Sequence, residues 1–265
     1  MTTLARDESQ SVRRGVLEAL AEVIYTFHED ADGPPDQLLR LFLGVREQDD
    51  VRRSEKAEEP PPPSPPSTPM SWSEFVSSMS SGMPEAAQEH DIYEDPSRPL
   101  VCAFNYPAVA LTLGRGRWHE IRELYLTLSE NPSVKVRRTL AASLGEIAKI
   151  IGPEQAKEDL VRVWWSSMRA EESEVRLKAV ESLTTFIPAL EDAERSDILR
   201  ELNGDVWSRL KMWREREAVM KALGSWAAIT GLDETVLRGL LRKGLQDTVA
   251  SVREESVTAV GRFIA

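Results

Sequence analysis

The chain has 265 residues, with 33 Lys and Arg against 44 Asp and Glu, three His and one Cys. A single cysteine excludes an internal disulfide and a closed zinc site, which needs several thiolate or imidazole ligands. The sequence also lacks a run of about 18 apolar residues, the minimum for a membrane span. We therefore expect a soluble protein of the cytoplasm, with the nucleus as a second location, and no membrane partner.

The formal charge of -11 is concentrated in one part of the chain. Residues 47–97 hold 12 acidic against 3 basic side chains, so the remainder carries 32 acidic and 30 basic residues and is nearly neutral. Nucleic-acid binding requires clustered Lys and Arg to neutralise phosphates. A nearly neutral body without a basic stripe argues against nucleic acid as the main partner.

Two amphipathic helices are predicted before the acidic part. The stretches "SVRRGVLEALAEVIY" (11–25) and "PPDQLLRLFLGV" (34–45) place apolar residues three and four positions apart, the spacing of one helix face. Residues 47–97 interrupt this pattern, with seven prolines between positions 60 and 69 among acidic and Ser-rich sequence. This composition is typical of a disordered, partly polyproline linker, so we predict a disordered insertion at 47–97.

Helical patterns resume after the insertion. The stretch "RPLVCAFNYPAVALTLG" (98–114) is predicted as the partner of the helix at 34–45, kinked or delayed by Pro107. No convincing alternation typical of strands is present, so the fold class is all-α. Further helices are predicted at 117–130, 135–150, 153–168, 174–190, 193–210, 215–229, 233–247 and 251–265.

Every second predicted helix carries the same internal pattern. Aligning their apolar positions brings one arginine of each helix into a single column, whose last four members are separated by 39, 40 and 37 residues. This period is typical of HEAT or armadillo repeats, in which stacked antiparallel helix pairs form a solenoid. We predict five to six such repeats including partial ones, with partial repeats at 1–46 and an array at 98–265. The column consists of Arg13, Arg137, Arg176, Arg216 and Arg253.

The arginine column has a structural interpretation. Each arginine lies near the start of a helix, where backbone groups lack helical partners, and a guanidinium can reach acids or carbonyls of a neighbouring repeat. Arg138 lies one residue off this column and is a candidate for partner contact, with plain solvation as the alternative. Trp213 lies at a turn and is a candidate interface anchor, with packing against the next turn as the alternative.

Catalytic motifs are absent from the sequence. It contains no Gly-rich phosphate loop, no nucleophile elbow and no HExxH motif, and three histidines leave little capacity for acid–base chemistry. We predict no enzyme activity, no cofactor, no metal and no small-molecule substrate. Within the insertion, Ser64 and Thr68 each precede proline and are candidate phosphorylation sites, although such dipeptides are common by chance in this composition.

One stretch is more specific than the general repeat pattern. The sequence "FNYPAVALTLGRGRWHEIRELYLTLSENPSVKVRRTLAASLGEIAKIIG" (104–152) resembles the regulatory subunit 1 family of protein phosphatase 4, HEAT-repeat relatives of the protein phosphatase 2A scaffold subunit. Weaker similarity covers most of residues 34–265. Members of this family are much longer, and the pattern stops inside a helix, so we expect this sequence to be a fragment truncated at its C-terminus.

The resemblance implies a function and a binding surface. It implies a non-catalytic regulatory or scaffold subunit that holds a serine/threonine phosphatase catalytic subunit, of the phosphatase 4 or 2A-like type, and its substrates. A generic HEAT-repeat adaptor for transport or assembly is the alternative. In the related scaffold, the turns within repeats bind the partner, which corresponds here to 130–135, 169–174, 210–214 and 246–251. The candidate partner-binding residues are therefore Lys135, Arg138, Glu171, Glu172, Lys211, Trp213 and Arg214.

Overall fold

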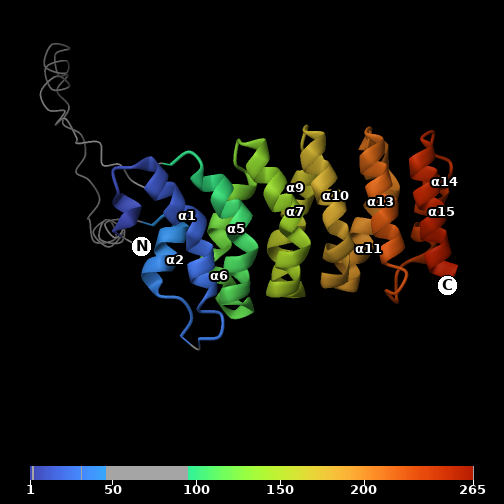
Figure 1. The fold of residues 1–265 in the computed structure, drawn as a ribbon. Coiled ribbons are helices and arrows are strands. Elements are labelled where there is room, and N and C mark those ends of the chain that lie inside the picture. Colours follow the sequence, from blue (N-terminus) through green and yellow to red (C-terminus); the bar gives the residue numbers. More distant parts are fainter. Residues whose placement is uncertain (2, 31, 46–94, 265) are drawn as a thin grey trace, which may run out of the picture.

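The computed structural model describes residues 1, 3–30, 32–45 and 95–264, and within these residues it contains helices and no strand. The helices stand side by side in a stack that follows chain order from one end to the other (Figure 1). The predicted all-α solenoid of stacked helix pairs is therefore confirmed. Most of the predicted disordered insertion, including Ser64 and Thr68, lies outside the described residues.

The helices form two rows. The first row, here called the B helices, packs each member against the next: α1 on α5, α5 on α7, α7 on α10, α10 on α13 and α13 on α15. Their bounds are α1 Gln10–Tyr25, α5 Arg98–Leu113, α7 Val134–Ile151, α10 Ser173–Phe186, α13 Trp213–Ser225 and α15 Ala250–Ile264.

The second row, here called the A helices, supplies the other member of each pair. Its simple members are α2 Asp36–Leu43, α6 Trp118–Ser129 and α14 Glu234–Leu245. Two members are composite, each made of two α-helical pieces joined by a π-turn. The first consists of α8 Pro153–Gln155, a π-turn at Ala156–Leu160 and α9 Val161–Arg169. The second consists of α11 Asp192–Glu201, a π-turn at Leu202–Val206 and α12 Trp207–Arg209. Short 3₁₀ turns lie at Leu4–Arg6, Arg115–Arg117 and Ile187–Ala189.

Local sequence accounts for the limits of the B helix α7. It begins after Ser133, which has extended backbone angles, and ends at Gly152, whose φ of 85° suits glycine. Along the helix, the apolar residues at three and four spacing are fully buried between its neighbours. They are Leu140, Leu144, Ile147 and Ile151.

Two prolines affect their predicted helices in different ways. Helix α5 runs continuously from Arg98 through Pro107, so the predicted delay by this proline is wrong. The missing N–H of Pro107 removes one helical hydrogen bond, and burial of one face of α5 outweighs that loss. The predicted helix at 174–190 instead changes to a 3₁₀ turn around Pro188.

Buried tryptophans connect the helix pairs. The indole N–H groups of Trp164 and Trp226 donate to the carbonyl oxygens of Ala179 at 2.9 Å and Leu183 at 3.2 Å. Trp118 donates to the buried carboxylate of Asp159 at 2.8 Å. Each bond joins two helices while satisfying a polar group that water cannot reach, so the tryptophans fix helix positions as well as filling the core.

The helices on both sides of residues 46–94 belong to the same stack. Arg98, the first residue of α5, donates to the carbonyl oxygen of Phe42 in α2 at 2.6 Å. The rings of Phe42 and Tyr106 have centroids 5.7 Å apart. The end of α2 and the start of α5 are therefore adjacent.

Candidate partner-binding ridge

The turns that join each A helix to its B helix lie along one edge of the stack, and we call this edge the ridge. The column arginine is always the fourth residue of its B helix. Its Nη1 turns back and donates to the carbonyl oxygen six residues earlier, at 2.6 to 2.9 Å in all five cases. The accepting residues are Asp7, Asn131, Ala170, Leu210 and Asp247.

Four of these arginines hold a second carbonyl of the same turn. Nη1 of Arg13, Arg137, Arg176 and Arg216 also donates to the carbonyl oxygen five residues earlier, at 2.8 to 3.1 Å. These carbonyls have left the preceding A helix and have no helical partner. A charged donor satisfies both of them, so each turn of the ridge is held in a fixed shape from within.

Three arginines also reach an acid of the following repeat. Arg137 Nη2 lies 2.7 Å from Glu172 Oε1, and Arg216 Nε lies 2.5 Å from Asp247 Oδ2. Arg176 Nε lies 3.0 Å from Glu215 Oε1. Each acid belongs to the repeat that follows its arginine. The arginines therefore connect successive repeats along the ridge.

The acids in these pairs respond to their partners. The hydrogen bond from Arg137 lowers the pKa of Glu172. Burial by itself would raise the pKa of Asp247, but hydrogen bonds from Arg216 and from the N–H of Val249 outweigh it and hold that pKa below its ordinary value. Both carboxylates are therefore held in the charged form that the ladder of ion pairs requires.

Glu215 is the acid that sequence reasoning missed. It is 1% exposed, and besides Arg176 it accepts the backbone N–H of Met212 at 3.3 Å. A signal for it existed, because Glu215 occupies the position directly before the column arginine, where the other B helices carry valine. A charge in an otherwise apolar, buried column requires a partner, and that partner is Arg176.

The ridge residues predicted for partner contact differ in their exposure and in whether an ion pair already engages them. Lys135 and Glu171 are exposed. Arg138 lies 2.6 Å from Glu174 of the next repeat, with side chains 42% and 52% exposed, so its charge is already paired. Glu172 is engaged by Arg137. Lys135 and Glu171 are thus the freer positions in this half of the ridge.

The turn at 210–214 combines an aromatic ring with basic side chains. Trp213 begins α13 and is half-buried against the core, and the guanidinium carbon of Arg214 lies 4.6 Å from its ring centroid. Lys211 is exposed, and Met212 beside it is 44% exposed. This turn therefore presents a fixed ring, an apolar tip and two positive charges to solvent.

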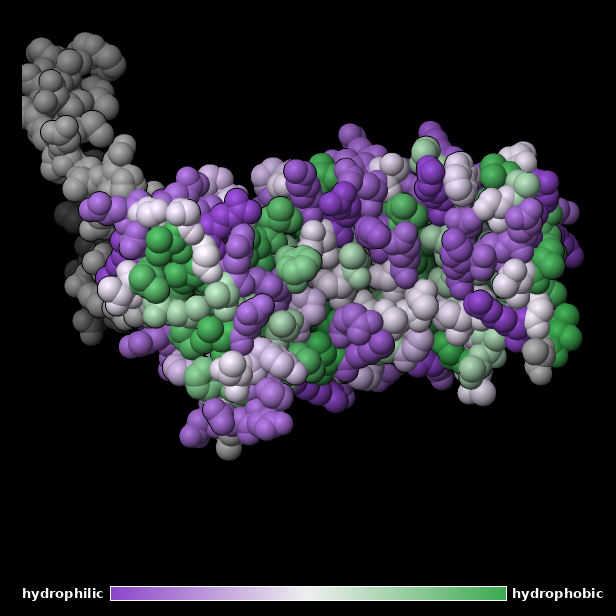
Figure 2. Space-filling view, in the orientation of Figure 1, coloured by the Kyte–Doolittle hydropathy of each residue, from purple (hydrophilic) through white to green (hydrophobic). Residues whose placement is uncertain are grey.

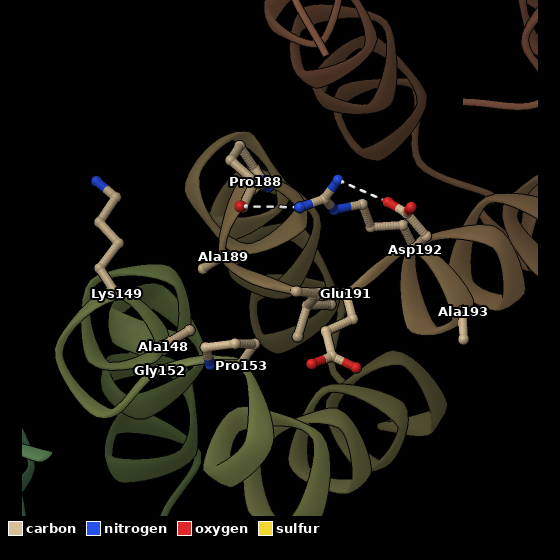
Figure 3. A pocket seen from close by; sticks show the side chains of 11 residues that line it. Ala148, Lys149, Gly152, Pro153, Pro188, Ala189, Glu191, Asp192 and Ala193 are labelled. Atoms are coloured by element: carbon tan, nitrogen blue, oxygen red, sulfur yellow. Dashed lines mark hydrogen bonds and ion pairs between the residues drawn. The ribbon is translucent and has the colours of Figure 1, made fainter. Parts of the chain in front are cut away.

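Two cavities lie at opposite edges of the stack. One of about 400 Å³ lies on the ridge, between the turn at 169–174 and the Arg137 side chain. The other, of about 760 Å³, lies where α7 and α10 end and α8 and α11 begin (Figure 3). There Arg195 is bound to Asp192 and to the carbonyl of Pro188, while Lys149 points away from the cavity. The larger cavity is thus separate from the ridge.

The part of the chain that the structure describes offers neither a metal-binding cluster nor a membrane-spanning helix. None of its His, Cys, Asp and Glu residues form a group of three or more that could hold a metal ion. None of its helices combines the length and the apolar character needed to cross a membrane.

Comparison with known proteins finds similarity over part of the chain. Residues 102–204 match a family model of the protein phosphatase 4 regulatory subunit 1 middle domain. The serine/threonine-protein phosphatase 4 regulatory subunits 1 of Homo sapiens and Mus musculus are each 37% identical over 138 residues, covering 49% of this chain and 14% of each relative. The chain therefore spans a small part of these relatives. These matches confirm the resemblance: this part of the chain is similar to protein phosphatase 4 regulatory subunit 1.

Proposed function

We propose that the chain is a non-catalytic scaffold that binds the catalytic subunit of a serine/threonine protein phosphatase, of the phosphatase 4 or 2A-like type, through the ridge. The observation that carries this proposal is the match of residues 102–204 to the regulatory subunit 1 middle domain. The matched residues include the ridge turns at 130–135 and 169–174. The rest of the ridge continues them in the same geometry.

The ridge has the rigidity that a docking surface needs. Binding costs free energy when loops must be ordered, and turns already held by their column arginines avoid most of that cost. The bonds from Arg176 and Arg216 to turn carbonyls hold the turns that carry Glu171 and Lys211. Side chains on these turns are therefore presented at fixed spacing, one repeat apart.

The charges along the ridge suggest how the partner is oriented. The turn at 169–174 exposes Glu171 and Glu174, whereas the turn at 210–214 exposes Lys211 and Arg214. A partner surface with basic groups facing the first turn and acidic groups facing the second would be complementary, and such complementarity fixes orientation and accelerates association. Trp213 lies within the basic turn and is a suitable central anchor, since tryptophan and arginine dominate interface energetics.

The test is direct binding of the full chain to the purified catalytic subunits of phosphatase 4 and phosphatase 2A, each measured by biolayer interferometry. The triple variant Lys211→Glu, Trp213→Ala and Arg214→Glu is expected to weaken binding by at least about tenfold, because it removes the anchor and reverses two charges. A double variant, Lys135→Glu in the turn at 130–135 and Glu171→Lys in the turn at 169–174, is expected to weaken phosphatase binding less than the triple variant does. Circular dichroism verifies that each variant remains folded.

A matched control lies on the opposite edge of the stack. Lys149→Glu reverses one exposed charge near the larger cavity and is expected to leave phosphatase binding unchanged. If the unaltered chain fails to bind the catalytic subunit of either phosphatase, the scaffold function is wrong and a general adaptor becomes the better interpretation. If it binds and the ridge variants bind equally well, the ridge assignment alone is wrong.

A further inference from the structure

Helix α5 exposes an apolar stripe. The side chains in this helix with the largest exposure are all big and hydrophobic: Leu100 at 37%, Phe104 at 76% and Leu111 at 54%. Their spacing of four and seven residues places them on one face of the helix. Figure 2 shows hydrophobic surface gathered along α5 on the face turned to the viewer.

The flanking B helices carry a different surface. The exposed residues of α1 include Arg14, Glu18 and Glu22, and those of α7 include Lys135 and Glu146. Single exposed apolar side chains are common on proteins, but an aligned set of three in the interior of a stack is not. The apolar stripe on α5 therefore has the character of an interaction surface.

The position of residues 46–94 points to one occupant. This segment leaves the stack after Val45 and returns at Asp95, five residues before Leu100. The contact of Arg98 with the Phe42 carbonyl holds the end of α2 beside the start of α5. Both attachment points are therefore at the helix that bears the stripe, which gives the segment a high effective concentration there.

The segment contains apolar side chains suited to the stripe. Within "SWSEFVSSM" (71–79) lie Trp72, Phe75, Val76 and Met79, in a segment otherwise dominated by proline, serine and charge. Residues 80–94 can span up to about 50 Å at 3.3 to 3.6 Å per residue. Helix α5, with 16 residues, is about 24 Å long. The tether is therefore long enough for residues 71–79 to reach any point of the stripe.

We propose that the apolar stripe of α5 is the docking face for residues 71–79 of the same chain. The apolar side chains of these residues cover Leu100, Phe104 and Leu111 and remove both sets from water. The proposal stands independently of the phosphatase function. A second copy of the chain or another protein on this face are the competing occupants that the experiment must separate.

A photo-crosslinking experiment on the full chain tests the contact. Benzoylphenylalanine replaces Phe104, and mass spectrometry locates the crosslinked residues after irradiation at low protein concentration. We expect crosslinks within one chain to residues 71–79. The same amino acid in place of Val257, which is 61% exposed on α15, serves as the control and should not reach this segment. Crosslinks between two chains, or none to 71–79, would overturn the proposal.

A binding experiment tests occupancy without crosslinking. The full-length quadruple variant Trp72→Ser, Phe75→Ser, Val76→Ser and Met79→Ser leaves the stripe free, and a fluorescent peptide of residues 70–83 is titrated against it by anisotropy. We expect the unaltered chain to bind this peptide at least about tenfold more weakly, because its own segment competes. Adding Phe104→Ser to the quadruple variant should abolish peptide binding. Equal binding by all three proteins would contradict self-occupancy.

Discussion

At the residue scale, the ridge depends on pairs that differ in burial. Glu215 is buried, and the partly buried guanidinium of Arg176 pairs with it and also holds two turn carbonyls. Arg138 and Glu174 form a pair of similar length in solvent. Water screens the exposed pair, whereas the buried pair cannot lose one member without leaving a charge uncompensated. The two arginines in neighbouring repeats should therefore contribute unequally.

Arg176→Ala is expected to destabilise the protein by about 3 kcal/mol, because Glu215 then keeps a buried charge without its partner. The matched change Arg138→Ala should cost less than about 1 kcal/mol. Urea denaturation followed by circular dichroism measures both. Equal losses for the two variants would show that burial does not control the strength of these pairs.

The lowered pKa of Asp247 predicts acid sensitivity of the ladder. Because Arg216 and the Val249 N–H lower this pKa in the folded chain, the stabilisation is fully present above the ordinary aspartate value of about 3.9 and is lost as pH falls through the lower folded value. Asp247→Asn should reduce stability at pH 7 and flatten its decline below pH 4. Urea midpoints between pH 2.5 and 7 test this, and an unchanged acid slope in the variant would contradict it.

At the element scale, the close packing of α7 on α10 depends on one glycine. A Cβ added to Gly145 would lie 1.8 Å from Thr185 Oγ1 and 2.9 Å from the backbone nitrogen of Phe186. The hydroxyl can rotate away, but the backbone of α10 cannot move without separating the two helices. Gly145 therefore sets the distance between successive B helices at this point of the stack.

Gly145→Ala is expected to destabilise the protein by about 2 kcal/mol through overpacking, despite the higher helix propensity of alanine. Gly15→Ala provides the control, since a Cβ on Gly15 in α1 meets no atom within 4 Å. That change should stabilise by about 0.5 to 1 kcal/mol. Thermal and urea denaturation of both variants decide the matter, and a stabilising Gly145→Ala would disprove the packing argument.

At the scale of the whole molecule, stability should vary along the stack. Each B helix packs on its neighbours in the row and on A helices close to it, so the core that runs from α1 to α15 is built up from contacts between successive helices (Figure 1). Repeat arrays of this kind are stabilised by nearest-neighbour interfaces. Helices in the middle have neighbours on both sides, whereas α15 has a B-helix neighbour on one side only within the described residues.

Hydrogen exchange measured by mass spectrometry should therefore show a gradient. Amides of α7 and α10 are expected to exchange slowest, and those of α1 and α15 faster, because local opening costs less where one interface is missing. The exchange of peptides covering each B helix gives the comparison directly. Uniform protection along the row would indicate a single cooperative unit instead.

The sequence by itself determined the helical repeat and the arginine column. Amphipathic spacing identifies helices because it depends only on residues within a turn or two, and the bonds from Arg137 to Asn131 and Pro132 span at most six residues. Such local contacts recur wherever the local pattern recurs. The positions of the turns along the ridge follow from the same pattern.

Only the tertiary structure decided which acid meets each arginine and which helix faces remain uncovered. Glu215 lies 39 residues from Arg176, and its partner could be identified only after the repeats were stacked. The same holds for Phe104, an apolar residue that is largely exposed on α5. Pairing and exposure depend on neighbours that are distant in the chain, and an apolar stripe in a sequence does not reveal whether another element covers it.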